Sequence, residues 1–102
     1  MKSIERICQQ LTVGEFEFSR HAFRRAVERN ISENEICEAG ELAELLEDYP
    51  DDKYAPSALL LGFTRVGRPL HLQVSRYDVL LVKIITLYEP DPAEWVEHQK
   101  RR

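Results

Sequence analysis

Three stretches with strand-like patterning follow one another near the middle of the chain, and they constrain the fold more than any other feature of the sequence. Short connections that carry turn residues separate them. Such connections join only antiparallel neighbours, because a parallel pair needs a crossover of about a dozen residues or more. The last stretch is mostly apolar on both faces, so we expect it in the interior of a sheet. The predicted strands cover residues 59–65, 70–75 and 79–88.

Helical patterns dominate the chain before these strands. Apolar residues recur at three-and-four spacing, which is typical of amphipathic helices, and Ser32 with Glu35 forms a capping-box signature. A fourth strand over residues 43–48, a loop over residues 49–56 and a short last helix over residues 93–99, which carries Trp95, complete the pattern. The sequence thus predicts one α+β domain over residues 1–102, with N-terminal helices on a small antiparallel sheet of about four strands. The predicted N-terminal helices cover residues 2–12, 20–29 and 32–40.

The charges are unevenly distributed along the 102 residues. The net charge is −4, yet Arg20 to Arg29 holds four arginines and one histidine against one glutamate, whereas Glu33 to Lys53 holds nine acidic residues and one lysine. Such segregation can steer an anion to one face, and it can equally serve a basic partner on the other. No apolar run has a membrane-spanning length and no signal-peptide pattern is present. We therefore expect a cytoplasmic protein without membrane contact.

The segment from Ser19 to Ile31 carries the most unusual residue choice. Its residues Ala22, Phe23, Ala26 and Val27 have the spacing of a buried stripe. A second ridge of the same helix holds three potential cations that repel one another at i,i+4 spacing. This arrangement suits an anionic ligand such as phosphate, or the chain's own acidic segment, or simply a solvated face. The ridge consists of His21, Arg25 and Arg29.

The strand over residues 70–75 alternates apolar side chains with His71 and two further polar residues. A two-residue loop at Tyr77-Asp78 would place Ile84 opposite His71, with Thr86 and Tyr88 on the His71 side of the sheet. A three-residue loop would place Lys83 there instead. The polar face of the strand is either solvated or part of a site, and both readings stay open.

Two imidazoles, a phenol and several guanidinium groups are the parts that RNA cleavage without a metal requires. A base takes the 2′-hydroxyl proton, an acid protonates the leaving 5′-oxygen, and guanidinium groups stabilise the charge on phosphorus. Histidine titrates near neutrality and suits either proton-transfer role. The acidic residues lack the spacing of a metal-hydrolase cluster, so we expect no metal and no cofactor.

The sequence resembles the DUF4258 family of small bacterial and archaeal proteins over roughly residues 16–96. The resemblance rests on Ser19, His21-Ala22, Arg25, Arg29 and Ile31, on Tyr49-Pro50-Asp51-Asp52, on Leu61-Gly62 and Gly67-Arg68-Pro69-Leu70-His71, and on Ile85-Thr86, Tyr88, Pro90-Asp91-Pro92 and Trp95. Asn30 stands where that family usually has glycine, which is tolerable because asparagine also accepts a positive φ.

That family is thought to be similar to the RelE-like (BECR-fold) ribonuclease toxins and is often encoded beside a YgiT-type zinc-finger antitoxin. The resemblance therefore implies a metal-independent endoribonuclease, an mRNA interferase toxin of a type II toxin–antitoxin pair, with mRNA and a cognate antitoxin as partners. It implies His21, His71, Arg25 and Tyr88 as catalytic residues, and Arg29, Arg68 and Thr86 as substrate-binding residues.

Two alternatives from other classes accompany this hypothesis. One is a non-catalytic binding module that contacts a protein partner through its acidic helix face, and the other is an inactive toxin-like protein. The predicted helices over residues 19–29 and 32–39 superficially resemble a helix-turn-helix. However, the second of these helices carries Glu33, Glu35 and Glu38, and Glu41 follows it. DNA phosphates would repel it, so we expect no specific DNA binding by the chain alone.

Overall fold

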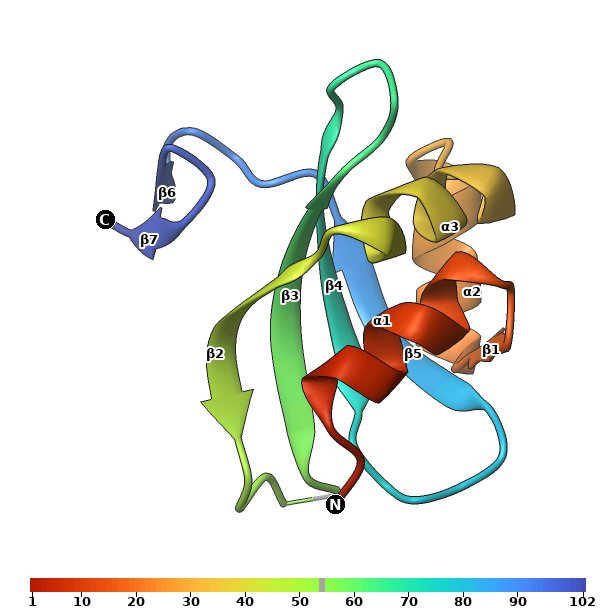
Figure 1. Cartoon of the computed structure of the whole chain (residues 1–102). Helices are drawn as coiled ribbons and strands as arrows, with labels where there is room; N and C mark the ends of the chain where they lie inside the picture. Colours follow the sequence, from red (N-terminus) through yellow and green to blue (C-terminus); the bar gives the residue numbers. More distant parts are fainter. Residues whose placement is uncertain (54) are drawn as a thin grey trace.

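A computed structural model of the protein describes residues 1–53 and 55–102 (Figure 1). Three helices and one short strand come first and four longer strands follow, while a small hairpin ends the chain. The helices are α1 (Ile4–Thr12), α2 (Arg20–Glu28) and α3 (Glu33–Glu41). The strands are β1 (Phe16–Phe18), β2 (Glu44–Tyr49), β3 (Ser57–Phe63), β4 (Pro69–Ser75), β5 (Val82–Tyr88), β6 (Trp95–Val96) and β7 (Lys100–Arg101). The predicted loop over residues 49–56 includes Tyr54, which lies outside the described residues.

Serine hydroxyls begin all three helices. The side chain of Ser19 accepts a hydrogen bond from the backbone N–H of Ala22, and Ser3 caps α1 in the same way. Ser32 and Glu35 form the predicted capping box at the start of α3. Between α2 and α3, Asn30 has a φ of 53°, a conformation that asparagine tolerates better than most residues. Capping by serine side chains thus accounts for the starts of the three predicted helices. None of the helices in the described residues is long and apolar enough to cross a bilayer.

Five strands form a mixed sheet in the order β1-β5-β4-β3-β2. The three consecutive hairpins from β2 to β5 are antiparallel, as predicted. The prediction of a purely antiparallel sheet of about four strands is wrong, because β1 pairs in parallel with β5. With three residues, β1 is too short to give a clear periodicity, and its parallel partner β5 lies more than 60 residues later in the sequence.

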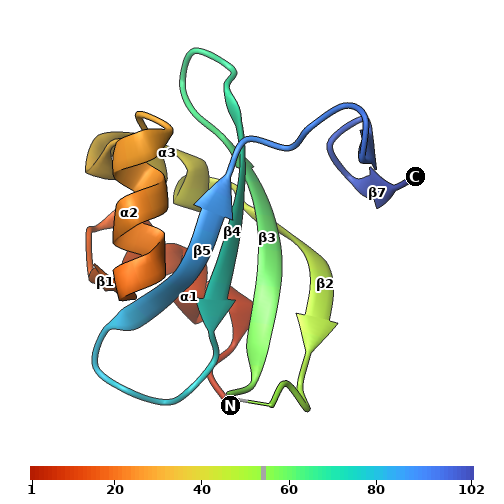
Figure 2. The ribbon, with the colours of Figure 1, turned by 180° about the vertical axis from the view of Figure 1, so that it is seen from behind.

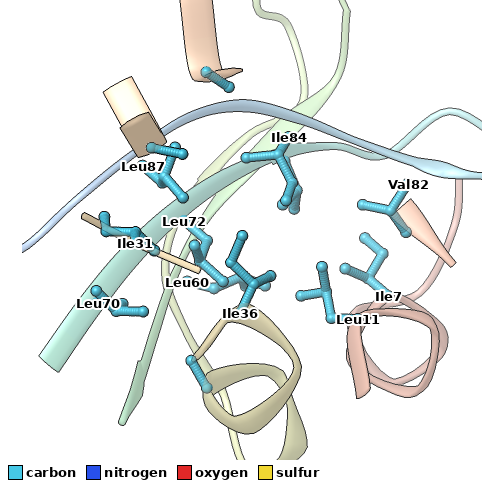
Figure 3. Packing of buried hydrophobic residues seen from close by; sticks show 14 of the residues in the cluster. Ile7, Leu11, Ile31, Ile36, Leu60, Leu70, Leu72, Val82, Ile84 and Leu87 are labelled. Carbon is cyan, nitrogen blue, oxygen red and sulfur yellow. The ribbon is translucent and has the colours of Figure 1, made fainter. Parts of the chain in front are cut away.

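The helices cover one face of the sheet, and the β6–β7 hairpin lies over part of the other (Figures 1 and 2). Figure 3 shows Leu11 and Ile36 pointing from α1 and α3 toward Leu60 and Leu72 on the sheet. Close approach is built into this interface at Gly62, where an added Cβ would lie 2.1 Å from the carbonyl oxygen of Ala39. The apolar core therefore lies between the helices and the sheet, and the opposite face is left for other side chains.

Two sequence interpretations of the helices need correction. The third helix was predicted to end at Gly40, yet Gly40 lies inside α3, where a Cβ would come within 2.5 Å of the Leu11 Cβ. Its role is the close contact between α1 and α3. On α2, Ala22 and Ala26 are buried as predicted, but Phe23 and Val27 are largely exposed. The buried stripe of α2 is narrower than the apolar pattern suggested.

The predicted C-terminal helix is wrong. Residues after Asp91 make a tight turn, and Trp95–Val96 then pairs with Lys100–Arg101 in a two-stranded sheet. The connecting residues Glu97 and His98 have φ values of 51° and 66°, as a tight hairpin turn requires. A seven-residue helix is marginal by itself, whereas the hairpin allows the Trp95 indole to be buried against the sheet.

Both predicted registers of the β4–β5 hairpin are also wrong. Residues 76–81 separate the two strands, and His71 stands opposite Tyr88 rather than Ile84 or Lys83. An irregularity after Gln73 shifts the pairing along the strand. Gln73 faces Thr86, so Thr86 and Tyr88 still lie on the His71 side of the sheet, as expected.

Candidate functional site

The side chain of His71 lies on the face of β4 that points away from the helices, and it is 0% exposed. Its Nε2 atom is 2.6 Å from the backbone carbonyl oxygen of His98. A carbonyl can only accept, so Nε2 carries the proton. Its Nδ1 atom is 3.2 Å from the hydroxyl of Tyr88 and accepts a hydrogen bond from it. The two contacts define one neutral tautomer of the imidazole.

The β6–β7 hairpin forms the cover over this ring. Trp95 is 2% exposed and meets the His71 ring edge-on, with centroids 4.4 Å apart. The guanidinium of Arg101 lies 4.6 Å from the centre of the Trp95 ring. Arg101 also binds both carboxylate oxygens of Glu47 on β2, with Nε 3.0 Å from Oε2 and Nη2 3.1 Å from Oε1. The β6–β7 hairpin is thus attached to the sheet through the Trp95 indole and through the Arg101–Glu47 ion pair.

The electrostatics of the cluster follow from this enclosure. Burial lowers the pKa of His71, and the positive charge of Arg101 lowers it further. Burial raises the pKa of the Tyr88 phenol. The hydrogen bond from Arg101 lowers the pKa of Glu47, which also accepts a hydrogen bond from the Tyr49 hydroxyl. The His71 imidazole is therefore kept neutral, and the Arg101–Glu47 ion pair lies at the edge of the cluster.

The basic ridge of α2 reaches this face at one end only. Arg29 donates from Nη1 to the carbonyl oxygen of Leu87 at 2.9 Å, and its guanidinium lies 6.0 Å from the centre of the Tyr88 ring. Arg25 pairs with Glu28 at 2.7 Å. His21 is exposed on α2. Because His71 is sealed and His21 is open, the two rings do not share an open patch in this structure.

The guanidinium of Arg68 connects the start of β4 with the turn between α2 and α3. It forms ion pairs with Glu35 at 3.0 Å and Glu89 at 2.9 Å. It also donates to the carbonyl oxygens of Asn30 and Arg29, at 2.9 and 2.8 Å. These contacts occupy the side chain, so it holds the α2–α3 turn in place. A phosphate would have to displace a carboxylate to reach it.

A pocket of about 590 Å³ opens beside Tyr88, between Arg29 and Arg68. Its remaining lining residues are acidic, and these are Glu89, Asp91 and Glu94. Among residues 1–53 and 55–102, no group of three or more His, Cys, Asp or Glu side chains is placed to hold a metal ion.

Of the seven predicted site residues, the structure brings His71, Tyr88 and Arg29 together, with Thr86 two pairs along the same strand interface. Sequence reasoning missed the groups that enclose them. The sequence pattern predicts a helix at Trp95 and no element at Arg101. A tryptophan shortly after two prolines is the available signal, because so large a side chain needs a surface to cover. The missed residues are Trp95, Arg101, Glu47 and Tyr49.

The family model described as "Domain of unknown function (DUF4258)" matches residues 18–89, from the last residue of β1 to the residue after β5. The chain belongs to the DUF4258 family. The match includes the His71–Tyr88 pair and Arg29, whereas the β6–β7 hairpin of this DUF4258 protein lies beyond the matched residues. No curated protein matches the chain. No solved structure matches it either.

Proposed function

We propose that this DUF4258 protein is a metal-independent endoribonuclease, an mRNA interferase toxin of the RelE-like type. The observation that carries the proposal is the imidazole–phenol pair of His71 and Tyr88, 3.2 Å apart, with the guanidinium of Arg29 against the same phenol. His71 and Tyr88 lie on the sheet face that points away from the helices, and Arg29 contacts the phenol from the end of α2. General acid–base and guanidinium groups in one place are what cleavage of an RNA phosphodiester requires.

In the proposed reaction, the His98 carbonyl has released Nε2 of His71, and Nδ1 donates to the Tyr88 hydroxyl. Nε2 then takes the proton of the 2′-hydroxyl while the 2′-oxygen attacks phosphorus. The bond from phosphorus to the 5′-oxygen breaks, and the departing oxygen receives a proton, which leaves a 2′,3′-cyclic phosphate and a free 5′-hydroxyl. Tyr88 orients the imidazole or stacks on a base, and Arg29 stabilises the negative charge on the phosphate. His21 and Arg25, farther along the ridge of α2, extend this contact to the RNA backbone, and the departing 5′-oxygen takes its proton from solvent.

The proposal requires the β6–β7 hairpin to lift. A ring that is 0% exposed cannot reach a phosphodiester, and the backbone of His98 occupies its Nε2 atom. The hairpin pairs only with itself in the described part of the chain and is attached to the main sheet through side chains. The closed structure is then the resting state, and RNA binds after residues 95–101 have moved.

The test is induction of the protein in a bacterial host, followed by growth and mRNA integrity. We expect growth arrest and mRNA cleavage with the wild type, and neither with His71→Gln, whose amide nitrogen replaces Nε2 and can still donate to the His98 carbonyl. Tyr77→Phe, a change on the β4–β5 loop, is the matched control for Tyr88→Phe and should leave toxicity intact. Co-expression of a neighbouring antitoxin, for which a YgiT-type zinc-finger protein is the proposed candidate, should restore growth. A harmless wild-type protein that leaves mRNA intact without any antitoxin would refute the proposal.

A further inference from the structure

A second feature of the surface lies on the helix side of the sheet, away from His71. An open groove of about 590 Å³ runs between α1 and the segment that leads from α3 into β2. Ile4 and Cys8 line one wall, and Leu42 and Ala43 line the other. Leu42 is 88% exposed, although it is a large apolar side chain at the rim of an apolar groove. Burial of such a side chain by a partner is favourable.

The neighbouring strand continues this apolar surface. β2 is the last strand of the sheet, and it hydrogen-bonds to β3 alone among the described strands. Leu45, opposite Leu60 of the core, lies on the helix side and is still 43% exposed. Among the described elements, no helix lies over β2 (Figure 1), so the groove, Leu42 and Leu45 form one uncovered apolar area.

The rim of this area is acidic. Glu5 and Glu41 line the groove. Both are exposed, and within the described residues neither of them has an ion-pair partner. These carboxylates repel nucleic acid and anionic lipid. They also oppose a symmetric pairing of two copies, which would bring the same carboxylates face to face.

We propose that this groove, the α1–β2 groove, is a docking site for a basic segment of a partner protein. The segment carries large apolar side chains that fill the groove, and lysine or arginine residues that meet Glu5 and Glu41. The site lies on the helix side of the sheet, so its occupation leaves the His71 face free. The inference therefore stands independently of the proposed nuclease activity.

The test uses a synthetic peptide of alternating leucine and lysine residues as the probe. We expect it to bind the full-length protein and to shift the backbone NMR signals of residues 41–45 and of the α1 residues that line the groove. A peptide of alternating serine and lysine should bind at least about tenfold more weakly, because it retains the charge and loses the apolar burial. A peptide of alternating leucine and glutamate should not bind.

Matched variants separate a specific site from general attraction to an acidic protein. Glu41→Lys and Glu94→Lys change the net charge equally, and both residues are exposed. We expect Glu41→Lys to weaken binding at least about fivefold and Glu94→Lys to change it by less than about twofold. Leu42→Ser should weaken binding about tenfold, whereas Leu80→Ser, an equally exposed leucine on the β4–β5 loop, should not.

Three results would overturn the proposal. The first is an equal loss of binding for both charge variants. The second is a set of shifted signals outside the α1–β2 groove. The third is the absence of peptide binding, whether or not the protein associates with a second copy through this surface. Since Leu42 and Glu41 are exposed, the variants keep the fold, which their NMR spectra verify.

Discussion

Replacement of Trp95 by alanine should open the β6–β7 hairpin without unfolding the domain. The indole is almost completely buried, and loss of a buried tryptophan side chain costs about 3–5 kcal/mol. The remaining attachments are weaker. The hydrogen bond from His71 to the His98 carbonyl contributes about 1 kcal/mol, and the partly exposed Arg101–Glu47 pair contributes about 0.2–1 kcal/mol. Ordering the hairpin backbone opposes them by about 1 kcal/mol or more per residue.

The effect should stay local, because Trp95 is not part of the apolar cluster between the helices and the sheet. We expect the free energy of unfolding of the main sheet to change by less than about 1 kcal/mol. The pKa of His71 should rise toward its ordinary value of about 6.5, since burial is the main cause of its lowering.

Carbethoxylation of histidine followed by mass spectrometry measures the opening. His21 is exposed and should react in every variant, so it serves as the internal standard. His71 should be protected in the wild type and in the control Phe23→Ala, and should react in Trp95→Ala. If His71 stays protected in Trp95→Ala, or if the whole domain unfolds with the loss of the indole, the hairpin is an integral part of the fold and the reasoning is wrong.

Three further predictions concern the scaffold and its pH dependence. Gly62→Ala should destabilise the protein by about 1–3 kcal/mol or more in urea unfolding, because the new Cβ meets the Ala39 carbonyl. Gly14→Ala, in open space at a φ of +81°, should cost only about 1–2 kcal/mol. Equal losses of stability in the two variants would contradict this view. Ser32→Ala should cost about 1 kcal/mol through loss of the α3 capping box, as measured by the same unfolding curves, and an unchanged midpoint would contradict it. As the pH falls below about 6.5, the unfolded state takes up a proton at His71 before the folded state does, so the free energy of unfolding should decrease. A His71→Gln variant should lack this part of the pH dependence in urea titrations at several pH values, and an unaltered slope would contradict the assignment.

The fold was predictable where the signal is local. Caps such as Ser32 with Glu35, and the short connections between β2 and β5, leave few alternatives for the chain. The parallel pairing of β1 was not, because three residues such as Phe16–Phe18 gain their strand geometry from a partner more than 60 residues away. The hairpin at Trp95 has the same origin, since the surface that the indole covers is made by β4 and β5.

The candidate site was predictable in composition and not in arrangement. His71, Tyr88 and Thr86 were expected on one sheet face, and they lie there even though the loop between β4 and β5 is longer than either predicted register assumed. The alternation of a strand indicates which side chains share a face, but it carries no information on what covers that face. Arg68 illustrates the same limit. Its ion pairs with Glu35 and Glu89 join the segment before β4 to α3 and to the residue after β5, and the sequence pattern does not predict that these segments are neighbours.

The most direct test of the account is the rate at which the purified Trp95→Ala protein cleaves RNA in the presence of EDTA, with and without the further change His71→Gln. The account predicts faster cleavage by Trp95→Ala than by the wild type, 2′,3′-cyclic phosphate ends on the products, and loss of cleavage in the double variant. Cleavage that persists unchanged in the double variant, or a folded Trp95→Ala protein that leaves RNA intact, would contradict it.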